Sequence, residues 1–432
     1  MAGAALAALA FAIVALSPAL AAAPVGPTYI GLQAYVVQAP YGSQVYGLQP
    51  PYPVNLSAVL GQLYLRNGSF YTDGEGPYVT VQLNVDLIGR GAGGPQFLWA
   101  QDVAAVGGAG PYEVSLIVNL WNFTGSSGYQ PGYGQPLNYS VVVGSAQLAS
   151  TPMGSLLVSR GPWLNVDAPL NLTLAIAAEG RYVGFYYSLG GPLEPFLVIS
   201  LPMNVSETVW PEEGMDAEFV VGGYGTSGEA YVTSWMGEAS IRYYYGPWTP
   251  PSPPPAWYCF PAMWTEGYQT AEDLSSSYGI SMTPNLTGWS FSEAAGPSGG
   301  QTMLARAVLR PAPGNATAYL WPPCANWTVT ATYLYAGTLH TVMVRAWGRD
   351  EVSLDVPAGS TYVNLTAIAW IGGFPAFVNS TAYGRLPKEG QSPLKVLAFM
   401  GPVSYVAVLA IASGVGAAVA AAVSRRAHRA PA

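Results

Sequence analysis

Carboxyl groups are the only reactive side chains that this 432-residue chain has in number, with 23 Asp and Glu against two His and two Cys. His428 lies in a basic tail and His340 stands alone, so the sequence excludes Ser-His-Asp and Cys-His catalysis. Neither HExxH nor a P-loop pattern occurs, so we expect no metal and no other cofactor. Two carboxyls can together catalyse hydrolysis when one is ionised and the other protonated, which suits an acidic medium. Asp-Thr-Gly and Asp-Ser-Gly are absent, which excludes a pepsin-type site.

Asp102 is the first candidate for a catalytic carboxyl. If 97–106 forms one strand, Asp102 shares its face with the apolar residues of that strand. Such a setting raises the pKa of a carboxyl and keeps it protonated, as a general acid requires. The alternative is a strand that ends at Gln101, which leaves Asp102 in a solvated turn.

Three further carboxyls complete the candidate set. Glu218 stands at the start of a segment that ends in Gly-Gly, where glycines let a substrate strand approach closely. The alternative for Glu218 is an ordinary surface carboxylate. Asp86 lies on the polar face of its strand with Gln82 and Asn84, and Asp216 shares a face with Glu218.

Short segments with a period of two carry these carboxyls. From Val79 to Leu87 every second residue is apolar, which predicts a half-buried strand. Gly, Pro, Asn and Ser separate many such runs, so we expect an all-β protein with antiparallel β-sandwich or barrel-like architecture. The further runs cover 96–106, 112–123, 139–149, 171–177, 182–188, 195–201, 217–222, 229–245, 326–335, 339–347 and 361–371.

A proline-rich segment divides these strands into two expected units. Residues 249–256 read Thr-Pro-Pro-Ser-Pro-Pro-Pro-Ala, which is typical of an extended linker. We expect a larger β domain over 24–248 and a smaller β-sandwich domain over 257–393. Cys259 and Cys324 fall in the second unit, and an oxidising compartment favours a disulfide between them over a metal site.

Both ends of the chain carry membrane signals. An apolar stretch that ends in small residues predicts a signal peptide over 1–23, and the alternative is an uncleaved anchor. The apolar segment within 394–424 is long enough for a transmembrane helix. The basic tail at 425–432 places the C-terminus in the cytoplasm and the ectodomain outside the cell.

The composition agrees with an exported protein. Only 9% of the residues are charged, against roughly 25% in ordinary soluble domains. The lack of a basic stripe excludes nucleic-acid binding, and a surface of uncharged polar groups keeps its hydration in acid. Eleven Asn-x-Ser/Thr sequons are candidate glycosylation sites: Asn55, Asn67, Asn122, Asn138, Asn171, Asn204, Asn285, Asn315, Asn326, Asn364 and Asn379.

Four sequence blocks follow one another over about 24–245: Ala23–Gly31, Phe97–Val103, Val118–Thr124 and Ala217–Gly223. In this order they resemble blocks of the thermopsin family of archaeal acid proteases. Phe97–Val103 resembles the family's Trp-x-Gln-Asn/Asp-Val element, and Val118–Thr124 resembles its Asp-Asn-Ile-Trp-Asn-Phe stretch. Ala217–Gly223 is similar to a Glu-Leu-Val-hydrophobic-Gly-Gly segment, and Ala23–Gly31 is similar to the family's start. The resemblance implies a secreted endopeptidase that cleaves extracellular proteins or peptides by carboxyl chemistry without a metal.

One departure from the family leaves two functions open. Val118 stands where the family shows Asp. If that Asp is structural, the chain is a membrane-anchored acid endopeptidase. If it is catalytic, the chain is a cell-surface glycoprotein with an envelope or adhesive role that keeps the fold without the chemistry. The enzyme is favoured if Asp102 and Glu218 lie close enough to share a water. If the two carboxyls lie on opposite faces, they cannot form the catalytic pair.

The end signals predict how the chain sits in its membrane. Protease added to intact cells should digest the ectodomain and leave a short membrane fragment, because only the C-terminal flank is basic. Mass spectrometry of membranes from treated cells would show this fragment, with detergent-lysed cells as the control. An ectodomain that survives until lysis would reverse the orientation.

Overall fold

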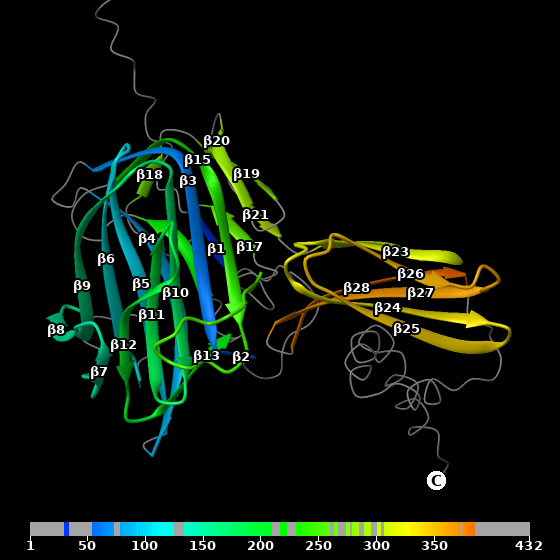
Figure 1. Cartoon of the computed structure of the whole chain (residues 1–432), viewed down its shortest axis with the longest axis horizontal. Helices are drawn as coiled ribbons and strands as arrows, with labels where there is room; N and C mark the ends of the chain where they lie inside the picture. Colours follow the sequence, from blue (N-terminus) through cyan, green and yellow to red (C-terminus); the bar gives the residue numbers. More distant parts are fainter. Residues whose placement is uncertain are drawn as a thin grey trace, which may run out of the picture.

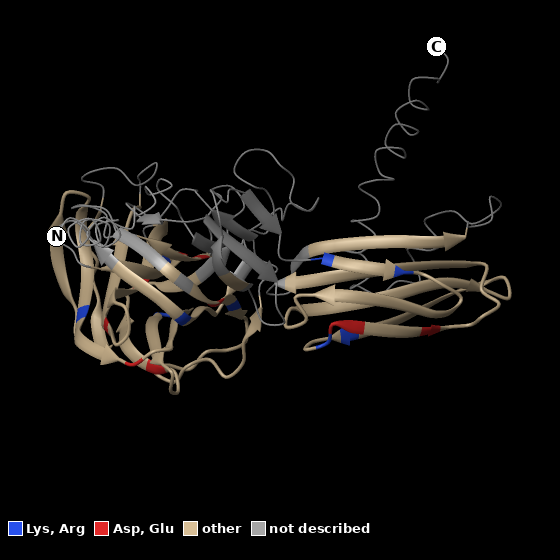
Figure 2. Cartoon of the chain, turned by 90° about the horizontal axis from the view of Figure 1, so that it is seen from above, with Lys and Arg blue, Asp and Glu red and all other residues tan. Residues whose placement is uncertain are grey.

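The protein is described from a computed structural model, and the part of the chain that it describes is all-β. Charged residues are sparse on these strands (Figure 2). Within this part, no helix is both long and apolar enough to cross a membrane. The expected signal peptide, membrane segment and basic tail lie outside the described residues, and they stay predictions. The described residues are 30–33, 54–72, 78–92, 94–124, 134–209, 217–222, 230–259, 263–266, 274–276, 279–284, 289–294, 300–303, 306–371 and 374–384.

The larger unit consists of two layers of strands (Figure 1). The first layer runs in the order β8-β9-β6-β5-β4-β14-β1-β17-β21, and β13 and then β2 extend it beside the far end of β4. The bounds are β1 (Ile30–Gln33), β2 (Val54–Leu56), β4 (Val79–Gly91), β5 (Gly94–Gly108), β6 (Tyr112–Asn122), β8 (Gln147–Thr151), β9 (Gly154–Val166), β13 (Asn204–Val209), β14 (Ala217–Gly222), β17 (Met263–Glu266) and β21 (Gly300–Met303).

The second layer runs in the order β7-β12-β11-β10-β3-β15-β20-β19, and β16 and β18 also pair with β15. A pair between Phe70 and Gly108 joins the two layers at one edge. The bounds are β3 (Ala58–Thr72), β7 (Ser140–Val143), β10 (Leu170–Glu179), β11 (Tyr182–Leu189), β12 (Glu194–Ser200), β15 (Ala230–Tyr244), β16 (Tyr258–Cys259), β18 (Leu274–Ser276), β19 (Gly279–Pro284) and β20 (Trp289–Ala294).

The main core lies between the layers and follows the period of two in the sequence. The alternating apolar residues from Val79 to Leu87 on β4 all enter this core and are at most 1% exposed. We call this side of the first layer the core face and its opposite side the polar face. The intervening residues Thr80, Gln82, Asn84 and Asp86 are also buried, so β4 is covered on both faces.

Strand pairing extends the larger unit beyond the proline-rich segment. The strands β16 to β21 follow this segment, yet they pair with β15, with β1 or with one another. The strand pairing therefore extends the larger unit to β21, past residue 257, where we expected the second domain to begin. The segment itself packs against the larger unit, since Trp248 Nε1 donates a hydrogen bond to Ser252 O at 2.7 Å and the Trp248 ring meets Tyr186 edge-on.

The smaller unit is a β-sandwich, as the alternation predicts (Figure 1). A three-stranded sheet in the order β22-β23-β26 packs on a four-stranded sheet in the order β25-β24-β27-β28, and Trp327 lies fully buried in the core that they enclose. The bounds are β22 (Arg306–Arg310), β23 (Gly314–Trp321), β24 (Asn326–Tyr335), β25 (Thr338–Ala346), β26 (Glu351–Val356), β27 (Tyr362–Ile371) and β28 (Phe374–Gly384).

The predicted disulfide is confirmed, but it joins the two units. Cys259 lies on β16 of the larger unit, and Cys324 lies between β23 and β24 of the smaller one, with 5.2 Å between their Cα atoms. Cys259 N also donates to Cys324 O at 3.0 Å. Nearby, Asn326 Nδ2 donates to Tyr245 Oη at 3.2 Å. The bond therefore fixes a junction between units.

Removal of this bond should loosen the junction. For a sequence separation of 65 residues, loop entropy predicts that replacing both cysteines with serine lowers the free energy of unfolding by on the order of 4 kcal/mol, less any strain. Denaturant unfolding followed by tryptophan fluorescence would measure the loss, with the reduced parent protein as the control. Equal unfolding midpoints for the variant and the oxidised parent would contradict the prediction.

Candidate functional site

A row of polar side chains crosses four strands on the polar face. Strand register places Glu218 on β14, Asn84 on β4, Gln101 on β5 and Asn119 on β6 opposite one another. Asn119 Nδ2 donates to Gln101 Oε1 at 3.1 Å, and Gln101 Nε2 donates to Asn84 Oδ1 at 3.0 Å. Asn84 Nδ2 then donates to Glu218 Oε1 at 2.7 Å. All three amides point their nitrogen toward Glu218, so the row ends on a carboxyl oxygen.

Gln82 braces this row from the neighbouring position of β4. Its Oε1 accepts a hydrogen bond from Gln101 Nε2 at 3.2 Å, and its Nε2 donates to Thr80 Oγ1 at 2.7 Å. Thr80 Oγ1 in turn donates to the backbone oxygen of Gly222 on β14 at 3.2 Å. The network thus links the amides on β4 and β5 back to the strand that carries Glu218.

Asp86 is the second carboxyl on this face. It lies two residues beyond Asn84 on β4, is 4% exposed, and is a diagonal neighbour of Glu218 across the β14–β4 pair. Diagonal neighbours are about 7–8 Å apart, a span that a Glu side chain and one water can bridge. Of the four candidate carboxyls, Asp86 and Glu218 are the two that the described structure brings together. Asp216 lies outside the described residues.

An aromatic cluster borders the carboxyls. Trp99 is opposite Asp86 in the β4–β5 register, and Trp121 follows opposite Trp99 on β6. Trp121 and Phe123 stack with their ring centroids 5.5 Å apart and pack against residues of β9. Trp121 is 6% exposed, so it is a packed residue of this face.

Asp102 lies on the opposite side of the same layer. On the core face it stands in register between Leu83 and Val118, and it is 1% exposed. The structure therefore separates Asp102 from Glu218, which removes this pair as a catalytic site. The reason is the period of two on β5, since Gln101 faces the polar row and its neighbour must face the core.

The carboxyl of Asp102 is isolated within the core. Neither of its oxygens has a hydrogen-bond partner. Burial raises its pKa well above the usual range, and the backbone of Ala175 on β10, which approaches without normal hydrogen-bond geometry, lowers that pKa by a smaller amount. The carboxyl therefore stays protonated to a higher pH than an exposed aspartate, in the direction that the sequence predicted from its apolar strand face.

The candidate glycosylation sites differ in exposure. Asn122 is 6% exposed and its Oδ1 accepts hydrogen bonds from the backbone and side chain of Thr124, so its amide closes a turn inside the protein. Asn285 and the side chain of Asn55 lie outside what the structure describes. Among the others, Asn67, Asn138, Asn204 and Asn315 are exposed, and Asn171, Asn326, Asn364 and Asn379 are partly buried.

Comparison with protein families finds a match that covers more than half of the chain and lies within the larger unit. The family model described as Thermopsin matches residues 26–276, a range that continues past the proline-rich segment into β18. Neither a curated protein nor a solved structure matches the chain.

The isolated carboxyl of Asp102 should make the fold more stable in acid. The folded state binds a proton that the unfolded state releases above a pKa of about 3.9, so stability is full below that value. As the pH rises above that value, the free energy of unfolding falls by about 1.4 kcal/mol per pH unit, until the pH reaches the raised pKa of Asp102 in the folded state. Denaturant unfolding of the parent and of Asp102→Asn should give similar stabilities near pH 3 and a more stable variant near pH 7. A difference that does not change with pH would contradict this linkage.

Proposed function

The chain belongs to the thermopsin family, and from this premise we propose that it is an acid endopeptidase whose catalytic carboxyls are Asp86 and Glu218. The observation that carries the assignment is the amide row that ends on Glu218 one diagonal step from Asp86. We further propose that the protein acts outside the cell on protein or peptide substrates. The signals at its two ends support secretion and anchoring by a C-terminal helix.

The proposed mechanism gives the two carboxyls different roles. Glu218 accepts from Asn84, and such a donor favours an ionised acceptor, so Glu218 is the general base in the proposed mechanism. It takes a proton from a water whose oxygen attacks the peptide carbonyl carbon. Asp86, protonated in acid, donates to the carbonyl oxygen. The tetrahedral intermediate collapses when Glu218 passes its new proton to the amide nitrogen, the carbon–nitrogen bond breaks, and Asp86 takes its proton back from the oxygen.

The amides between the strands act as positioning groups in this proposal. Asn84 and Gln101 are neutral, so their hydrogen bonds persist while the carboxyls titrate. The row therefore holds Glu218 in one place across the acidic range in which the enzyme is proposed to work. Positioning of this kind lowers the barrier because the reacting groups need not reorganise.

Val118 supports the second candidate function, a surface glycoprotein without catalysis. It lies directly opposite Asp102 on the core face. The family resemblance implies Asp at this position, and two carboxyls placed there would have Cβ atoms about 4.5–5.5 Å apart. If the family's catalytic pair lies on this face, Val118 leaves this chain with only one of its members.

Conservative amide variants would test the assignment. Glu218→Gln and Asp86→Asn should each lower turnover of an acid-denatured protein by at least about 100-fold, because each removes one acid–base role. Glu113→Gln changes an exposed carboxyl on β6 and should leave turnover unchanged. Product analysis from strongly acidic to neutral pH would give both the rate and its pH profile.

Two results would contradict the proposal. Full activity of Glu218→Gln and Asp86→Asn, with the parent's pH profile, would move the chemistry to other carboxyls. A parent protein that is folded but inactive at every pH would support the surface glycoprotein instead. Val118→Asp is then the variant in which activity should appear.

A further inference from the structure

The smaller unit projects away from the larger one (Figure 1), and the loops at its far end are uncharged. Strand register brings three connections to this end: 311–313 between β22 and β23, 336–337 between β24 and β25, and 357–361 between β26 and β27. They contain only Pro, Ala, Gly, Ser and Thr. We call these loops, together with the flanking Tyr335 and Tyr383, the tip.

The two tyrosines of the tip are exposed. Tyr335 ends β24 and is 43% exposed, and Tyr383 lies next to the end of β28 and is 49% exposed. A Cβ atom on Gly359 would lie 3.3 Å from Cε2 of Tyr335, so the ring of Tyr335 packs beside the loop between β26 and β27. The nearest Arg, Asp and His side chains belong to the strands and not to these loops: Arg310, Asp355 and His340.

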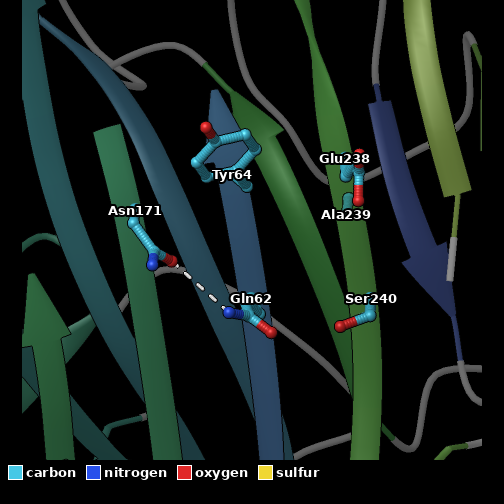
Figure 3. Close-up of a pocket in the computed structure, with 6 residues that line it drawn as sticks. All are labelled: Gln62, Tyr64, Asn171, Glu238, Ala239 and Ser240. Atoms are coloured by element: carbon cyan, nitrogen blue, oxygen red, sulfur yellow. Dashed lines mark hydrogen bonds between the residues drawn. The ribbon is translucent and has the colours of Figure 1, made fainter. Parts of the chain in front are cut away.

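The groove on the outer side of the second layer of the larger unit provides a contrast. Tyr64 lies there beside Glu238 (Figure 3), and 2.6 Å separates Glu238 Oε1 from Arg66 Nη2. An apolar surface that covered this tyrosine would also have to desolvate the two charges, at a cost in free energy. The connection between β25 and β26, at the junction end of the smaller unit, holds Arg349 and Asp350. In the tip, by contrast, exposed tyrosines stand among uncharged loops.

The chain leaves the smaller unit at the tip, toward its predicted membrane segment. Gly384 ends β28 and pairs with Tyr362 at the start of β27, so the exit lies at the same end as the loops. Eleven residues separate Gly384 from the uncharged run that begins at Val396, and a chain of this length spans at most about 40 Å. The junction lies about 30 Å behind the tip, because β24 has ten residues. Such a tether keeps the tip closer to the bilayer than the junction.

We propose that the tip rests in the headgroup region of the membrane, with the rings of Tyr335 and Tyr383 as its contacts. Tyrosine suits this depth because its ring is apolar while its hydroxyl stays hydrated. Loops without charge avoid the cost of moving a charged side chain toward the hydrocarbon. The proposal rests on the proposed C-terminal anchor and not on the catalytic carboxyls. It holds the larger unit away from the lipid, where extracellular proteins can reach it.

The test uses the full chain in phosphatidylcholine vesicles that contain a lipid with a nitroxide on its headgroup. Both native cysteines are in the disulfide, so Ala358→Cys adds a single free thiol in the tip for a fluorescent label. Arg349→Cys, at an exposed position of the junction end, is the matched control. We expect the label at position 358 to lose most of its fluorescence to the nitroxide and the label at position 349 to keep it.

Tyrosine variants and flotation complete the test. Tyr335→Ser and Tyr383→Ser together should restore the fluorescence at position 358, whereas Tyr182→Ser, which changes an exposed tyrosine of the larger unit, should not. Flotation with the vesicles measures the anchor separately. Protein that floats while both labels stay bright overturns the proposal and leaves the anchor intact. Protein that does not float removes the anchor and the proposal together. A label shielded from dissolved iodide but not quenched by the lipid would mean that another protein covers the tip, which also overturns the proposal.

Discussion

The burial of β4 and β5 on both faces is the constraint on which the rest of the structure depends. A strand at the surface can leave its polar side chains to water, but a strand covered on both sides must satisfy them within the protein. The two faces meet this requirement differently. Over Val79–Leu87 of β4 and Leu98–Val106 of β5, the core face carries apolar side chains apart from Asp102, whose raised pKa favours its neutral form. The polar face instead joins its groups into one row, and this row is what holds a carboxyl in a defined place.

Local sequence pattern predicted many of the strands but not their partners. The alternation from Val79 to Leu87 gave the correct strand and the correct core face, and the strand over 96–106 correctly turned Asp102 toward apolar neighbours. The prediction that the first of these strands is half-buried was wrong, because its polar residues are buried as well. The expected run over 139–149 is interrupted at Gly144, which has a positive φ of 82°, and becomes β7 and β8. Long strands such as β3 and β9 were not predicted, because they mix glycine and polar residues with the apolar ones.

The amide row could not be predicted, because it depends on pairing between distant segments. Asn84 and Glu218 are 134 positions apart in the chain, and only the β14–β4 register brings them into contact. For the same reason, the sequence did not predict where the larger unit ends. Prolines at 250–255 predict an extended linker, but the segment turns at Pro250–Pro251, bends at Ser252, and packs next to the apolar surface of Trp248. The strands beyond it then return to β15 and β1, which composition alone does not reveal.

Amides and carboxyls respond differently to acid, and this difference connects the fold to its proposed environment. An ion pair weakens when its carboxylate is protonated, whereas a hydrogen bond between two amides does not change over that range. The polar row consists of three amides and only one carboxyl. Protonation of Glu218 can therefore change the last hydrogen bond of the row, while the hydrogen bonds between the amides remain. Asp102 goes further, since its isolation makes the protonated form the one that the fold prefers. A chain with 9% charged residues has few ion pairs to lose. Apart from Asp86, Asp102 and Glu218, the polar side chains that its central strands bury are amides and hydroxyls, which acid leaves unchanged.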